Sequence, residues 1–410
     1  MEDFKSPLVE VREVKELIID EYNLELFKLN CVACLYPYVF IAYRKSVIIY
    51  RNSGKNSSIE YVHTIKLAHE INFIRNSYNK IFIVGEEGMT MMILKLEKDS
   101  TLNEFNDEIA FAPSKSQQDS DLEQQYGLKL INLHQNSHES TWSISYDGPS
   151  GIFAVGDNSH IIKVHLPDCK EKEPFTLEGH SHNLPCLHLY SKDRLLSCSI
   201  DKSCKVWDLT ERKVLYNHDF NEWCWVCTRL NPKSFVHAPQ DSHLTDIFLI
   251  GTQSYVYLLN SSMDTVLYKL FLKPIRGLRL LPGHIYGALE RVSLLQVIEK
   301  HNLILIAKQN DNKVLLLRMV YCEQRKEYSL TPVDILPALT LENQCIIGLG
   351  YCEVLDRIYI LCLDKQMYCY DLRFKFTNDL CFQKDFEQGR EANHERVPDE
   401  HLYSISQIVI

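Results

Sequence analysis

The chain has 410 residues, of which 45% are hydrophobic and 24% charged, and its formal net charge is −10 at pH 7. This is the composition of an ordinary globular protein. The acidic balance argues against a protein that binds nucleic acid directly, because phosphate contacts need clustered Lys and Arg. The longest uncharged apolar runs, such as 343–352, have about ten residues, half of what a membrane-spanning helix needs.

The first predicted element is a short amphipathic helix over Leu8–Asp20, within an N-terminal arm of residues 1–22. Val11, Val14, Leu17 and Ile18 recur there at helical spacing among charged residues. The acidic, mixed N-terminus is unlike a signal or transit peptide. We therefore expect the protein in the nucleus, the cytoplasm or both, and we expect no contact with a membrane.

Seven strand–turn–strand segments follow at irregular spacing. Each has an apolar strand, a polar turn of two or three residues, and a second apolar strand. Their first strands begin at Tyr38, Lys80, Gly151, Leu195, Asp246, Leu303 and Arg357. We assign the first two segments to residues 23–97 and the other five to residues 141–382.

Three stretches are predicted to lie outside these segments. Residues 98–140 include a long Ser-, Gln- and Asp-rich run and are expected to be a disordered polar insert. Residues 383–400 form a charged linker. Residues 401–410 alternate like a strand, and we expect them to close the fold against its first repeat.

The segment from Gly179 to Asp208 carries the strongest motif in the chain. It opens with Gly-His, closes with Trp-Asp, and resembles a WD repeat, the four-stranded blade of a β-propeller. This spacing predicts a hydrogen-bond relay in which Asp201 holds His180, His180 reaches Ser199, and Ser199 reaches the Trp207 indole. Such a relay satisfies buried polar groups, so we interpret these residues as structural rather than as a catalytic triad.

The repeats predict an all-β fold, a seven-bladed WD-repeat β-propeller with a short N-terminal helix. A pair of β-sandwiches is the alternative. It explains the hairpins but gives no reason for the Gly-His to Trp-Asp spacing.

The fourteen cysteines predict free thiols in a reducing compartment. Two Cys-x-x-Cys pairs, Cys31/Cys34 and Cys224/Cys227, lie too far apart in sequence for a zinc ribbon. Both stand in apolar runs typical of strands, so we expect buried structural cysteines, with no bound metal and no cofactor.

No phosphate-binding glycine loop, nucleophile elbow or His-Glu-x-x-His motif is found in the sequence. We therefore predict a protein that is not an enzyme, with a propeller hydrolase as an alternative. Loops at one face of a propeller are the usual binding surface. The candidate partner face consists of Trp142, Asn158, His160, His182, Asn183, Trp223 and Trp225. Of the two neighbouring tryptophans, one is a candidate exposed anchor, and blade-to-blade packing of both is the alternative.

A second candidate site lies at the end of the seventh repeat. Tyr370, Asp371 and Arg373 are similar to the Trp-Asp-x-Arg box of WD-repeat substrate receptors for cullin–RING ubiquitin ligases. The resemblance implies that Arg373 reaches an adaptor protein and that the predicted N-terminal helix docks beside it. An ordinary blade end with a solvated arginine is the alternative.

The segment from Trp142 to Asp208 resembles the fungal WD-repeat family named for constitutive ribonucleotide-reductase transcription. The similar stretches are 140–144, 152–160 and 179–185. The resemblance implies a role in transcriptional control, in the DNA-damage response and in a cullin ligase. We therefore expect an interaction scaffold, a monomer within a complex, that holds a ligase adaptor and a client protein. A scaffold subunit of a chromatin, RNA-processing or trafficking complex is the competing interpretation.

Overall fold

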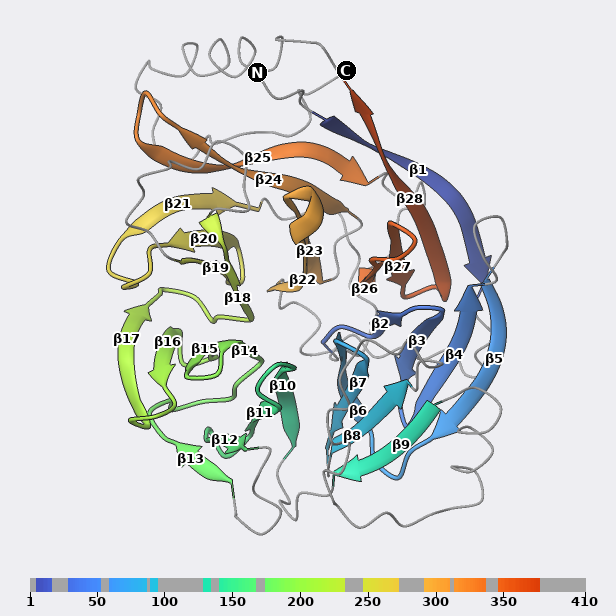
Figure 1. Ribbon diagram of the computed structural model, residues 1–410, viewed down its shortest axis with the longest axis horizontal. Helices are drawn as coiled ribbons and strands as arrows, with labels where there is room; N and C mark the ends of the chain where they lie inside the picture. Colours follow the sequence, from blue (N-terminus) through green and yellow to red (C-terminus); the bar gives the residue numbers. More distant parts are fainter. Residues whose placement is uncertain are drawn as a thin grey trace, which may run out of the picture.

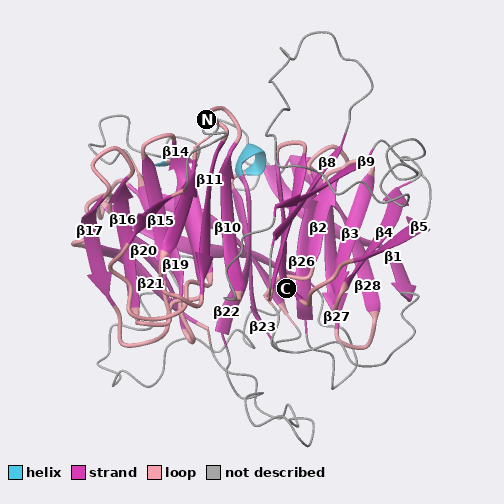
Figure 2. Cartoon of the chain, turned by 90° about the horizontal axis from the view of Figure 1, so that it is seen from below, coloured by secondary structure: helices cyan, strands magenta, loops and turns pink. Residues whose placement is uncertain are grey.

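The structure is a computed structural model, and it describes residues 5–16, 29–52, 59–86, 89–94, 128–133, 140–166, 174–232, 246–272, 291–309, 313–336 and 346–376. Its strands form four-stranded antiparallel sheets arranged in a ring (Figure 1). Seen from the side, the strands span the thickness of the ring, and the connections lie at its two faces (Figure 2).

In chain order the strands are β1 (Lys5–Glu16), β2 (Val32–Leu35), β3 (Tyr38–Tyr43), β4 (Ser46–Asn52), β5 (Ile59–Lys66), β6 (Ile71–Ser77), β7 (Lys80–Gly85), β8 (Met89–Leu94), β9 (Leu128–Leu133), β10 (Thr141–Asp147), β11 (Ile152–Asp157), β12 (Ile162–His165), β13 (Phe175–Leu177), β14 (Cys186–Ser191), β15 (Arg194–Cys198), β16 (Ser203–Asp208), β17 (Lys213–Asp219), β18 (Val226–Leu230), β19 (Ile247–Gly251), β20 (Tyr255–Leu259), β21 (Val266–Phe271), β22 (Arg291–Ile298), β23 (Leu303–Gln309), β24 (Val314–Cys322), β25 (Glu327–Leu336), β26 (Ile346–Cys352), β27 (Arg357–Cys362) and β28 (Gln366–Phe376). Among the described residues the helical structure is one 3-10 turn, Glu299–His301.

Six sheets are each built from four consecutive strands, from β2–β5 through β22–β25. A seventh combines β26, β27 and β28 with β1 from the other end of the described chain. The predicted all-β propeller is confirmed. In this seventh sheet the two ends of the described chain meet, because β1 pairs with β28.

The predicted helix over Leu8–Asp20 is wrong where the structure describes it, because residues 5–16 form β1. A register shift between Val11 and Glu13 leaves one extra residue in β1. As a result, Val11 and Val14 stand opposite Tyr370 and Tyr368, which lie on one face of β28. In a regular strand, residues on one face are two apart, but a β-bulge of this kind makes them three apart at one point. The three-residue spacing of Val11 and Val14 therefore resembles the spacing of apolar residues on a helix.

Two predicted segments lie wholly outside the described residues. They are the linker 383–400 and the expected closing strand 401–410. The closing strand that the structure shows is β1, which pairs with β28 along most of its length. The expected insert 98–140 contains β9, the outer strand of the second sheet, so the prediction of one continuous insert is wrong.

The second strands of the sheets are mostly apolar because both of their faces are covered. Every described residue of β7, β19 and β27 is buried. The outer strand β17 is mostly exposed, with half-buried positions only at Leu215 and His218. A strand packed between neighbouring sheets loses the alternation of polar and apolar residues that a half-exposed strand shows.

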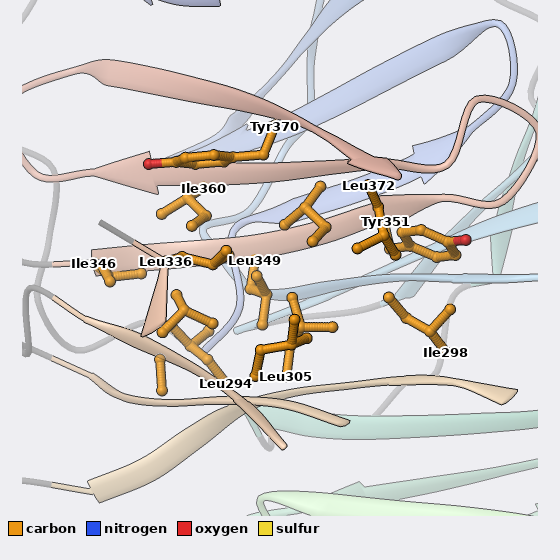
Figure 3. Packing of buried hydrophobic residues seen from close by; sticks show 14 of the residues in the cluster. Leu294, Ile298, Leu305, Leu336, Ile346, Leu349, Tyr351, Ile360, Tyr370 and Leu372 are labelled. Atoms are coloured by element: carbon orange, nitrogen blue, oxygen red, sulfur yellow. The ribbon is translucent and has the colours of Figure 1, made fainter. Parts of the chain in front are cut away.

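The core is divided into clusters that lie between adjacent sheets. One of them joins Leu294 and Leu305 of the β22–β25 sheet to Leu349, Ile360 and Tyr370 of the next sheet (Figure 3). Burying one such side chain stabilises the fold by about 1.5–3 kcal/mol. The ring is therefore held together mainly by sheet-to-sheet packing.

The two faces of the ring are named by the direction of the inner strands β2, β6, β10, β14, β18, β22 and β26. The end at which these strands begin is called the top face, and the end at which they finish is called the bottom face. Because neighbouring strands are antiparallel, loops that precede an inner strand and turns between the second and third strands share the top face.

Candidate partner-binding face

The hydrogen-bond relay of the fourth sheet uses a different serine from the predicted one. The His180 ring lies with Nδ1 2.8 Å from Asp201 Oδ2 and Nε2 2.8 Å from Ser197 Oγ. The Trp207 indole Nε1 donates to Ser197 Oγ over 2.8 Å. The prediction is therefore correct for His180, Asp201 and Trp207, and wrong for Ser199.

Strand register explains the change of serine. Leu195 lies opposite Trp207 on β15 and β16, so Ser197 is the diagonal neighbour of the indole on the same face. Ser199 lies beyond the end of β15, and its hydroxyl donates to the carbonyls of His182 and Asn183. Ser199 therefore shapes the loop before β14 and is not part of the relay.

Burial and a mutual hydrogen bond shift the pKa values of His180 and Asp201 in the relay. Burial lowers the pKa of His180, and the hydrogen bond and charge of Asp201 partly offset that effect. Burial raises the pKa of Asp201, but hydrogen bonds from His180, Ser203 and the Ser181 amide outweigh it and hold that pKa below its ordinary value. The carboxylate is thus kept charged, and it fixes the turn that lies beside the top face.

The third and fourth sheets place five of the seven predicted partner-face residues at the top face. Asn158 follows β11, and its backbone N–H donates to the carbonyl of Ser140, two residues before Trp142. The rings of His160 and His182 are 5.5 Å apart. Asn183 donates its backbone N–H to Nδ1 of His182 over 2.8 Å.

Two polar atoms of this group are buried without a hydrogen-bond partner. They are the indole Nε1 of Trp142 and Oδ1 of Asn158. A buried donor or acceptor that makes no hydrogen bond costs about 1–3 kcal/mol. A surface that binds another molecule by rearranging its side chains can recover part of that cost.

The two tryptophans before β18 differ in exposure. Trp225 is buried, its ring stacks under the Arg291 guanidinium at 4.5 Å, and its Nε1 has no partner. Trp223 is half-buried and contacts Trp225 edge-on, with ring centroids 6.2 Å apart. Because β18 begins at Val226, both rings belong to a top-face loop, and Trp223 is the more exposed of the two.

Sequence reasoning missed the residues that shape this loop from the next turn. Glu222 accepts hydrogen bonds from the Thr252 hydroxyl at 2.7 Å and from the Ser254 amide at 2.8 Å. Burial lowers the pKa of Arg291, at the start of β22, to about 10. The sequence could have indicated these residues by their positions. Each lies just before an inner strand, at its first residue, or in the turn after a second strand.

The residues of the second candidate site lie in the bottom half of the ring. Tyr370 is 1% exposed and packs in the cluster of Figure 3. Asp371 accepts a hydrogen bond from Arg357 Nε over 2.9 Å. Arg373, two residues further along β28, is exposed and pairs in register with Leu8 of β1. Only Arg373 of the three is therefore placed on the surface.

Two curated relatives match part of the chain. A WD40 repeat-containing protein of Dictyostelium discoideum is 36% identical over 102 residues, which cover 24% of this chain and 15% of that protein. An uncharacterized WD repeat-containing protein of Schizosaccharomyces pombe is 31% identical over 112 residues, covering 24% of this chain and 23% of that protein. The matched region spans under a quarter of the length of either relative.

Among solved structures, a chain in a crystal structure of the mitotic checkpoint complex has the same fold. It is 14% identical, with a TM-score of 0.56 over 90% of this chain and 95% of that chain. The protein is a β-propeller, and part of its chain is similar to WD-repeat proteins. No protein-family model matches the chain, so its relationship rests on these relatives, on the ring of sheets and on the His180–Ser197–Trp207 relay.

The cysteines of both Cys-x-x-Cys pairs are buried in this propeller. Cys31, Cys34, Cys224 and Cys227 are all at most 5% exposed. In the described part of the chain, no group of three or more His, Cys, Asp or Glu side chains is arranged to hold a metal ion. The same described residues contain no helix with the length and apolarity needed to cross a membrane.

Proposed function

We propose that this propeller is a protein-interaction scaffold whose partner binds the top face around Trp223, His182 and His160. The observation that carries the proposal is that these side chains come from top-face loops of three consecutive sheets. The rings of His160 and His182 are 5.5 Å apart, and the Cys224 N–H beside Trp223 donates to the carbonyl of Ser199, whose hydroxyl donates to the carbonyl of His182. The WD-repeat relatives and the fold neighbour, which comes from a multiprotein complex, support a role in protein assembly.

The chemistry of this surface suits a protein segment with both apolar and polar groups. Trp223 offers a half-buried ring, and aromatic residues contribute strongly to binding energy at protein interfaces. The buried Nε1 of Trp142 and Oδ1 of Asn158 are an unpaired donor and an unpaired acceptor on one sheet. A partner's peptide group carries the complementary acceptor and donor.

The test begins with partners captured on the immobilised wild-type chain and identified by mass spectrometry. Each is then purified, and its dissociation constant is measured for Trp223→Ala, His182→Ala and Val354→Ala. His182 is exposed, so its replacement leaves the fold intact. Val354 is 67% exposed and follows β26 at the bottom face, which makes it the matched control.

We expect the two top-face variants to weaken binding by about tenfold or more and the Val354 variant to bind like the wild type. A partner that loses affinity only for Val354→Ala, or equally for all three variants, overturns the proposal. Melting temperatures of the variants separate loss of binding from loss of fold.

A narrower version places a ubiquitin-ligase adaptor on the opposite side. We propose that Arg373 contacts such an adaptor, because it is exposed in the bottom half while Tyr370 and Asp371 are committed to internal contacts. The helix that the sequence analysis expected beside it is instead β1, so the contact would rest on Arg373 and its own strand.

The test compares Arg373→Ala with Arg325→Ala in capture of a purified adaptor of a cullin–RING ligase. Arg325 is an exposed arginine in the turn between β24 and β25, which is also at the bottom face. Selective loss of the adaptor with Arg373→Ala supports this version. Equal retention by both variants removes it and leaves the top-face proposal standing.

A further inference from the structure

Five cysteines converge between the fourth and fifth sheets of the propeller, although they are spread over 42 residues of sequence. Four of them are at most 2% exposed, and the fifth, Cys186, is half-buried on an inner strand. None of them has a role in the top-face proposal. The five are Cys186, Cys198, Cys204, Cys224 and Cys227.

Strand register sets the spacing of three of these thiols. Cys186 on β14 lies directly opposite Cys198 on β15, and Cys198 lies directly opposite Cys204 on β16. Directly opposite residues of antiparallel strands have Cα atoms about 4.5–5.5 Å apart. A disulfide requires a Cα separation of roughly 4.4–6.8 Å, so Cys186 and Cys198 meet that requirement without movement of the strands.

The next sheet packs against the same pair. Cys186 Sγ donates to the carbonyl of Cys227 over 3.4 Å, and Cys227 Sγ lies 3.7 Å from the carbonyl of Cys186. On the other side, Arg75 Nη1 donates to the carbonyl of Leu187, the residue after Cys186, over 3.1 Å. Cys186 is thus bordered by two thiols and one guanidinium.

These neighbours favour the thiolate of Cys186 over those of the other cysteines. Hydrogen bonds from the thiols of Cys198 and Cys227, together with the charge of Arg75, lower the pKa of Cys186. Burial raises the pKa of Cys198 and of Cys227. Redox-sensitive cysteines commonly combine a stabilised thiolate, partial exposure and an adjacent second thiol.

We propose that Cys186 is an oxidation site for hydrogen peroxide and that Cys198 is the thiol that converts the oxidised product to a disulfide. The Cys186 thiolate attacks one peroxide oxygen, the O–O bond breaks, and the hydroxide that leaves takes a proton to become water. Cys186 is then a sulfenic acid. The Cys198 sulfur attacks the Cys186 sulfur, the S–O bond breaks, and the Cys198 proton departs with the hydroxyl group as a second water.

Thiol oxidation is proposed here in preference to metal binding because the described cysteines do not have the geometry of a metal site. The proposal goes beyond the interaction function and does not depend on it. It also distinguishes the five cysteines by reactivity, since Cys186 is expected to react with hydrogen peroxide first.

The experiment uses the reduced full-length chain with one to two equivalents of hydrogen peroxide near neutral pH, followed by alkylation of free thiols and peptide mapping. Trypsin separates the two cysteines, because the peptides 173–192 and 195–202 contain one cysteine each. We expect these two peptides to be joined by a disulfide. We also expect Cys186 to be oxidised about tenfold or more faster than Cys322, which is half-buried on β24.

Variants separate the two roles. Cys198→Ser should leave a sulfenic acid at Cys186 that dimedone traps, Cys186→Ser should abolish peroxide-dependent disulfide formation, and Cys322→Ser should behave like the wild type. The peptide map of the oxidised wild type identifies the disulfide-bonded cysteines even if a variant fails to fold. A disulfide between other cysteines, or oxidation of Cys322 as fast as Cys186, overturns the proposal.

Discussion

Arg357 donates from Nη1 to Asn52 Oδ1 over 3.2 Å, although 305 residues separate the two in sequence. The Tyr359 hydroxyl donates to the same oxygen over 2.7 Å. Between the same two sheets, the Asn30 side chain donates to the carbonyl of Leu349 and accepts from its backbone N–H. These bonds join the first sheet to the last, so two asparagine side chains help to close the ring in addition to β1.

Replacing Asn52 by Ala should therefore destabilise the protein as a whole. Two buried donors, on Arg357 and Tyr359, would lose their shared acceptor, at a cost of about 1–3 kcal/mol. Urea unfolding measures this cost. Asn217→Ala is the matched control, since Asn217 is exposed on β17, and it should change the free energy of unfolding by less than about 0.5 kcal/mol. Equal effects from the two variants would contradict the ring-closing role of Asn52.

Replacing Ser197 by Ala should remove the central member of the relay. Ser197 is fully buried, and its hydroxyl is shared by the His180 ring and the Trp207 indole. We expect a loss of about 2 kcal/mol in unfolding free energy. Ser191→Ala, which removes a half-buried hydroxyl bonded to Asp193, serves as control and should cost well under half as much. A Ser197 variant as stable as the Ser191 variant would show that the relay contributes little.

Replacing Gly85 by Ala should be far more damaging than replacing Gly148. A Cβ at Gly85 would lie 2.1 Å from the backbone oxygen of Glu70, whereas one at Gly148 would meet only the Tyr78 ring. Tyr78 is 60% exposed and can move aside. We expect the Gly85 variant to lose about 3 kcal/mol or more, typical of overpacking, and the Gly148 variant about 1 kcal/mol or less. Thermal unfolding followed by circular dichroism distinguishes the two, and a reversed order would contradict the prediction.

Stability should fall as the pH is lowered, in part because of His188. Burial, aided by the charge of Arg75, lowers the pKa of His188 from 6.5 to about 3. Below pH 6.5 the unfolded chain gains a proton at this residue and the folded chain does not. This contribution to stability is therefore complete above the unfolded pKa and is lost as the pH falls toward the folded one.

His188→Gln should consequently flatten the pH dependence of unfolding. Between pH 6.5 and about pH 5, we expect the unfolding free energy of the wild type to fall by about 1 kcal/mol more than that of the variant. This is less than the whole pKa shift would give, because His188 is only half-buried and solvent screens its charge. NMR titration of the imidazole provides a direct measurement. An imidazole that titrates near its ordinary pKa in the folded protein would contradict the prediction.

The sequence alone was enough to predict the repeats. After a charged first residue, strands such as β7 and β27 are apolar runs that end at polar turns. That pattern is local, so it can be recognised without knowledge of the fold. The Gly-His to Trp-Asp spacing likewise predicted three of the four relay residues, since the motif keeps His180, Asp201 and Trp207 at positions that one blade brings together.

Tertiary structure decided the features that depend on strand register or on a distant segment. The apolar spacing of residues 5–16 resembles that of a helix because β1 has one bulged residue between Val11 and Glu13. Only the pairing with β28 shows that this segment is a strand with a bulge. Ser197 and Ser199 lie on the same side of an ideal strand, so the sequence pattern does not distinguish them. Because β15 ends at Cys198, Ser197 and not Ser199 is the serine that bonds to His180 and Trp207. The thiols of Cys186 and Cys227 meet because two sheets pack face to face, and sheet packing leaves no local pattern in the sequence.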